Sequence, residues 1–153
     1  MNSLVNSATN TETIKRIEKL TPDSKPLWGT MSVSKMVKHL NIALQNALGE
    51  LKFERSEMRK KFSEMAKPMI LNNEPFGKSM PSDENFILKD EPDFLIERTK
   101  LIESVKEFSQ SYTEKGKEAT SSSEHPFFGE LTSEEWDQLM WKHLDHHLRQ
   151  FGV

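Results

Sequence analysis

Apolar side chains recur every three or four positions along most of this sequence. That spacing gathers them on one face of an α-helix, and no segment shows the alternation that is typical of a β-strand. The pattern predicts four helices, at about residues 10–20, 32–48, 92–112 and from 132 to the C-terminus. A shorter amphipathic piece is expected near 55–66. The predicted fold class is therefore all-α, a four-helix bundle with one long crossover between its second and third helices.

Capping residues and prolines indicate where these helices begin and where they cannot continue. Thr9 followed by Glu12 predicts a capping box at the start of the first helix, and Thr132 followed by Glu135 predicts another at the start of the last. Four prolines between residues 67 and 92 exclude a regular helix there. A connection of this length is typical of a lid, a binding loop or a mobile segment.

Length and charge restrict the class of protein. The 153 residues are enough for one domain, spanning residues 1–153, with a sizeable core. The net charge is −3 and there is no basic run, so nucleic acid is not an expected partner. The sequence has no apolar stretch long enough to cross a membrane and no secretory signal at its start, so we expect a cytoplasmic protein with no membrane partner.

The sequence contains no cysteine. This excludes disulfides, thiolate metal sites and a cysteine nucleophile. A metal ion would have to be held by His, Asp or Glu, and a reacting thiol would have to arrive with a ligand.

Three of the five histidines lie in the stretch WKHLDHHLRQF. At about 100° per residue, His143 and His147 are only about 40° apart on the helix, within the apolar stripe of Trp136 and Met140. His146 is turned by about 100° from His147. Two imidazoles at i and i+4 suit zinc or a similar ion. The alternative is a pair of core histidines that bond to the backbone or to a carboxylate.

His39 lies at the border of the apolar stripe of the second helix. If that helix lies beside the last one, His39 could complete a site of three histidines, which leaves coordination positions open as catalytic sites do. Otherwise it is an ordinary boundary histidine. The predicted cofactor is one divalent metal ion. Zinc, nickel, iron and copper all accept such ligands, so ligand type alone does not choose among them, and we expect zinc or nickel. Because only unprotonated imidazole binds a metal, binding should weaken below about pH 6.

These segments resemble the DinB/YfiT-like superfamily of small four-helix metalloenzymes. The pattern there is a tryptophan-containing linker, a helix with a single histidine, and a final helix with H-x-x-x-H. Here it is carried by LWGTMSVSKMVKHL and WKHLDHHLRQFG. More narrowly, RIEKLTPDSKPLWGTMSVSKMVKHLN together with HPFFGELTSEEWDQLMWKHLDHHLRQFG resembles a branch classed as domain of unknown function 1569. The resemblance covers both ends of the chain and is weak from residue 52 to 112.

The resemblance implies that His39, His143 and His147 are the metal ligands. It also implies a homodimer, since members of the superfamily are often dimeric. Some relatives transfer small thiols such as bacillithiol, mycothiol or glutathione to electrophiles, and others are isomerases. We therefore expect a metal-dependent enzyme, an S-transferase or a hydrolase, that acts on a small molecule such as a low-molecular-weight thiol.

His146 and His125 are candidates for proton transfer in such an enzyme. Each has a structural alternative: His146 could hydrogen-bond a neighbouring helix, and His125, which precedes a proline, could anchor a turn. The alternative function for the whole chain is a stress-associated helical module that binds a metal or another ligand without catalysis.

Overall fold

The computed structural model covers residues 1–153 and describes residues 2–54, 57–78, 87–119 and 124–153. The described part is all-helical, with one isolated bridge between His125 and Gly129. The prediction of an all-α chain is confirmed. The elements are α1 (Ser7–Glu18), α2 (Val33–Ala47), α3 (Glu57–Ala66), α4 (Pro68–Leu71), α5 (Phe94–Lys115), the short 3-10 turn η2 (Gly116–Glu118) and α6 (Ser133–Gln150).

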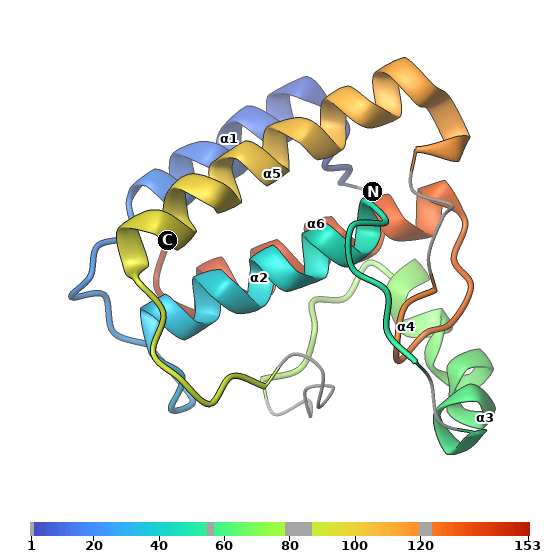
Figure 1. The fold of residues 1–153 in the computed structure, drawn as a ribbon, viewed down its shortest axis with the longest axis horizontal. Coiled ribbons are helices and arrows are strands. Elements are labelled where there is room, and N and C mark those ends of the chain that lie inside the picture. Colours follow the sequence, from blue (N-terminus) through green and yellow to red (C-terminus); the bar gives the residue numbers. More distant parts are fainter. Residues whose placement is uncertain (1, 55–56, 79–86, 120–123) are drawn as a thin grey trace.

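The four longer helices pack as two pairs. In Figure 1, α1 and α5 run side by side in one layer, and α2 and α6 form the other. Helix α2 contacts both α5 and α6, and α1 contacts the same two helices. Helices α3 and α4 project from one end of this arrangement, where α4 packs against α6. The layer of α2 and α6 therefore places the histidine-bearing helices next to each other.

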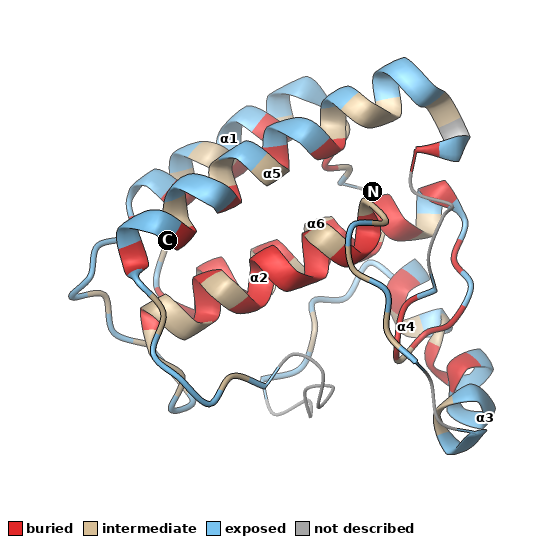
Figure 2. Ribbon diagram, in the orientation of Figure 1, coloured by how far each residue is buried: buried red, intermediate tan, exposed pale blue. Residues whose placement is uncertain are grey.

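The core lies between these two layers. Helix α2 is the most enclosed element, with eleven of its fifteen residues buried, because α5 covers one side and α6 another. Figure 2 shows the same contrast: α2 and α6 are largely buried, whereas α1 and α5 turn exposed faces outward. No helix within the described residues is both long enough and apolar enough to cross a bilayer. The largest fully buried side chains are Trp136, Phe108, Leu4, Ile17, Leu20, Met36, Leu40, Leu44, Ile70, Leu101, Met140 and Leu144.

The two predicted capping boxes have different outcomes. At the start of α6, Thr132 and Glu135 form both bonds of the box, as predicted. The box predicted from Thr9 and Glu12 is wrong, because α1 begins earlier and Thr9 lies inside its first turn. The N-cap is Asn6, whose side-chain oxygen accepts from two first-turn N–H groups at 3.0 and 3.1 Å.

The proline-rich stretch from 67 to 92 contains one turn of helix, α4, which the sequence analysis excluded. The reason is the position of Pro68: at the start of a helix the missing N–H has no intrahelical partner to lose. Residues 79–86 of this stretch, including Pro81, lie outside the described residues.

Helix α5 continues past its predicted end at Tyr112 into the polar segment that was expected to be a connector. It stops at Gly116, whose φ of +62° lies in the left-handed region that glycine adopts without strain. Residues 120–123 of the same polar segment are outside the described part of the chain.

Candidate metal centre

Three histidine rings meet between α2 and α6. The Nε2 atoms of His39 and His143 are 2.7 Å apart. The ring centroids of His39 and His147 are separated by 4.8 Å, and those of His143 and His147 by 4.9 Å. One potential ligand atom from each ring lies within 4.8 Å of the other two. The structure thus brings together the three residues that the sequence analysis selected as ligands.

Helix geometry and helix packing each contribute to this meeting. His143 and His147 are one turn apart on α6, so their rings project in nearly the same direction. Because α2 packs against α6, His39 approaches from the facing helix. His39 and His147 are only 3% and 6% exposed, whereas His143 is partly open to solvent. His143 is thus the least buried of the three residues.

The donor set fits a divalent metal ion of the first transition row. Neutral imidazole nitrogen binds zinc, nickel, iron and copper well, and three protein ligands leave positions open. The Nδ1 of His147 lies 2.8 Å from the side-chain oxygen of Gln150, which leaves Nε2 of His147 as its ligand atom. Hydrogen bonds of this kind hold metal-binding imidazoles in place. Without a metal, the 2.7 Å contact between His39 and His143 serves as a hydrogen bond from one ring to the other.

The protein around His143 and His147 keeps these two rings uncharged. Burial, followed by the neighbouring His39 and His147, lowers the pKa of His143 well below 6.5. Burial, with a smaller effect from His39, lowers the pKa of His147 to about 3. His143 and His147 are thus in the form that binds a metal. Protons should compete with a metal for them at a lower pH than the value of about 6 expected from the sequence.

These pKa shifts predict how the stability of the metal-free protein depends on pH. An unfolded histidine takes up its proton near pH 6.5, but folded His147 does so only near pH 3. Between these values the unfolded state holds more protons, so the free energy of unfolding should fall as the pH falls. The slope from each histidine of this kind should be small at pH 7.5 and approach about 1.4 kcal/mol per pH unit near pH 5.5, where the unfolded ring is mostly protonated. Urea unfolding between pH 7.5 and 5.5, with chelator present, measures it.

The control for this pH dependence is His147→Ala. It removes one of the buried titrating rings, so the mean slope between these pH values should decrease by about half a proton, and by nearly one proton at pH 5.5. A slope that is the same in the variant and in the wild type would show that His147 does not carry the effect.

His146 and His125 occupy different surroundings from the three clustered rings. His146 faces Trp28 and Phe76, with ring centroids 5.7 and 6.3 Å away. Burial and then Arg149 lower its pKa, and its Nδ1 has no hydrogen-bond partner among the described residues. The Nδ1 of His125 accepts from the backbone N–H groups of residues 127 and 128, at 3.0 and 3.1 Å. His125 thus anchors its own turn, and in its neutral form carries the ring proton on Nε2. A role in proton transfer stays a prediction for both residues.

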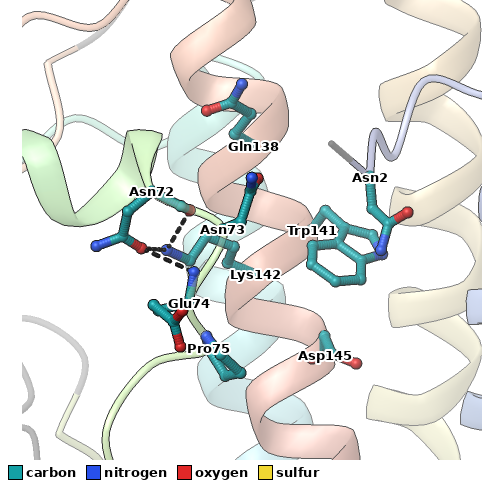
Figure 3. Close-up of a pocket in the computed structure, with 9 residues that line it drawn as sticks. All are labelled: Asn2, Asn72, Asn73, Glu74, Pro75, Gln138, Trp141, Lys142 and Asp145. Carbon is teal, nitrogen blue, oxygen red and sulfur yellow. Dashed lines mark hydrogen bonds between the residues drawn. The ribbon is translucent and has the colours of Figure 1, made fainter.

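The described structure also has a cavity of about 300 Å³, on a different face of α6 (Figure 3). No histidine lines it. Lys142, on its wall, donates to the backbone carbonyl of Met69 and to the carbonyl and side chain of Asn72, and burial lowers the pKa of its amine. These contacts fasten the end of α4 to α6. The cavity is lined by Asn2, Asn72, Asn73, Glu74, Pro75, Gln138, Trp141, Lys142 and Asp145.

Two backbone groups near the histidines were not predicted from the sequence. The carbonyl of Trp28 accepts from the side chain of Gln150, and a backbone bond to Phe76 raises the pKa of His146. A carbonyl is present at every position, so residue type gives no signal for such contacts.

Comparison with known proteins identifies a family. The family model described as "Protein of unknown function (DUF1569)" matches residues 3–152. The curated proteins include no significant match. The solved structures include none either. Because the family model spans almost the whole chain and both histidine-bearing helices, the chain belongs to the DUF1569 family of proteins of unknown function.

Proposed function

We propose that this protein is a metal-dependent enzyme that holds one divalent ion, zinc or nickel, with His39, His143 and His147. The observation that carries the proposal is the meeting of three imidazoles from two helices, with ligand atoms within 4.8 Å of one another. The pairing of α1 with α5 and of α2 with α6 supports a second part of the proposal, that the fold is a four-helix bundle of the DinB/YfiT-like superfamily.

We propose as the reaction a transfer of a small thiol to an electrophile or a hydrolysis. A divalent ion in this site would supply Lewis acidity, which lowers the pKa of a thiol or of water at an open position. The absence of cysteine favours the thiol, because no thiol of this sequence competes for the metal. His143 is the least buried of the three ligands, so we propose that a substrate approaches from its side; His39 and His147 are buried.

The surroundings of the remaining histidines favour His146 over His125 as the residue that moves a proton. The Nδ1 lone pair of His146 has no partner among the described residues, and its ring lies 5.0 Å from that of His147. The low pKa of His146 keeps it unprotonated at neutral pH, as a base must be. The Nδ1 of His125 is occupied by two backbone N–H groups, so that atom is not available to accept a proton.

Metal analysis and a turnover assay test this function separately. Protein purified without a histidine tag should contain about one zinc or nickel ion per chain after exposure to the metal and dialysis. A screen of small thiols with electrophiles, and of hydrolysable esters and amides, should then show turnover that a chelator abolishes. Absence of bound metal would contradict the site. Bound metal without turnover of any substrate would favour the non-catalytic binding module.

A further inference from the structure

The side chain of Gln150 connects one proposed metal ligand to the linker between α1 and α2. Its oxygen Oε1 lies 2.8 Å from Nδ1 of His147, and its nitrogen Nε2 donates to the carbonyl of Trp28 at 3.0 Å. The backbone carbonyl of the same residue accepts from the N–H of Leu27 at 2.7 Å. Gln150 is only 6% exposed, so these three contacts are its main polar partners. Gln150 therefore ties the linker to the C-terminal end of α6 through both its side chain and its backbone.

The direction of the Gln150 amide determines which nitrogen of His147 carries the proton. A backbone carbonyl can only accept, so the group facing Trp28 must be the amide NH₂. The amide oxygen then faces His147, and because this oxygen can only accept, Nδ1 of His147 must be the protonated nitrogen. The lone pair of His147 is consequently on Nε2. His39 and His143 also approach each other through their Nε2 atoms.

Gly29 makes room for this amide. Its φ of +77° is in the left-handed region, and a Cβ added there would lie 3.0 Å from Nε2 of Gln150. Any larger residue at this position would therefore both strain the backbone and push the amide away from the carbonyl of Trp28. The position of the Gln150 amide thus explains why a glycine suits position 29 of the LWG linker.

We propose that Gln150 is a positioning residue of the metal centre and that the Trp28–Gly29 backbone directs it. The carbonyl of Trp28 orients the amide, the amide holds His147 in the tautomer that presents Nε2, and the linker thereby sets the metal affinity of a site to which it contributes no ligand. This inference rests on the function proposed above. Hydrogen-bond partners of metal-binding histidines act in this way and contribute about 10- to 100-fold to metal affinity.

Two substitutions of Gln150 test the chemical part of the proposal. Gln150→Leu removes the acceptor, and should lower zinc affinity by about 10- to 100-fold. In the metal-free protein, ¹⁵N chemical shifts of the imidazoles should show His147 as the Nδ1–H tautomer in the wild type and as a mixture in this variant. Gln150→Glu keeps an oxygen that accepts from Nδ1, so it should retain that tautomer, although its second oxygen cannot donate to the carbonyl of Trp28.

A matched pair of glycine substitutions tests the role of the linker. Gly29→Ala should lower zinc affinity and disturb the tautomer of His147, because its Cβ meets the Gln150 amide. Gly116→Ala is the control: its φ of +62° imposes a similar backbone strain, but its Cβ would meet no atom within 4 Å. It should lose stability without losing zinc affinity. An equal effect of both variants on zinc affinity would overturn the linker's role.

The outcomes separate this inference from the proposed function. If the wild-type protein binds no zinc or nickel, the proposed function is wrong and the inference falls with it. If the wild type binds zinc and Gln150→Leu binds it equally well, with His147 still in the Nδ1–H form, then only the positioning role is wrong. Should Gln150→Leu not fold, the Gly29→Ala and Gly116→Ala pair decides the question by itself.

Discussion

Replacing His147 by alanine should remove most of the bound metal from the protein. The same result is expected for His143→Ala and His39→Ala, because each substitution takes one of three imidazole ligands from the site. The loss in affinity should exceed the factor of about 10 to 100 that follows removal of a partner of a ligand. The metal content of each variant after dialysis, and the affinity from competition with a chelating dye, measure the effect.

His146→Ala is the matched control for this experiment. The substitution removes an imidazole one position away from His147 on the same helix. The ring of His146 faces Trp28 and Phe76 rather than the proposed ligands. It should keep most of the metal. Circular dichroism would verify that all four variants remain helical. If all four variants lost the same amount of metal, the direction in which these rings project would not determine metal binding.

Replacing Trp136 by alanine should have the largest effect on stability. Trp136 is fully buried on α6 and packs against the ring of His125, with centroids 5.6 Å apart. Loss of a buried aromatic side chain costs about 3–5 kcal/mol, through lost transfer free energy and the cavity that remains. Because a domain has a total stability of about 5–15 kcal/mol, this variant should be close to unfolding at room temperature. Urea unfolding monitored by circular dichroism measures the change.

Two further variants identify the cause of that loss. Trp136→Phe should cost much less, because the indole nitrogen has no hydrogen-bond partner among the described residues and most of the ring volume is kept. Phe62→Ala, on α3, should change the stability by no more than about 0.5 kcal/mol, because that ring is 51% exposed. If Trp136→Ala and Phe62→Ala unfolded at the same urea concentration, Trp136 would not be part of the core.

The helices themselves were largely predictable because their signals are local. Apolar spacing located α2, α5 and α6 to within a few residues, and the capping box at Thr132 gave the start of α6. The errors in the helix boundaries were also local. Asn6 rather than Thr9 is the N-cap of α1, and Pro68 lies at the start of α4, where a proline does not prevent a helix. In the first case the sequence offered two candidate caps three positions apart and did not rank them; in the second, the same proline can end a helix or begin one.

The sequence by itself determined that His143 and His147 share one face of a helix, because the rotation per residue is a property of the backbone. Only the tertiary structure decided that His39, 104 positions earlier, reaches the same point, since that depends on how α2 packs against α6. Burial, and with it the pKa of His147, arises from the same packing. The contact between Gln150 and the carbonyl of Trp28 joins segments 122 positions apart through a group that every residue carries. Binding of a metal stays a prediction that the variants above can test.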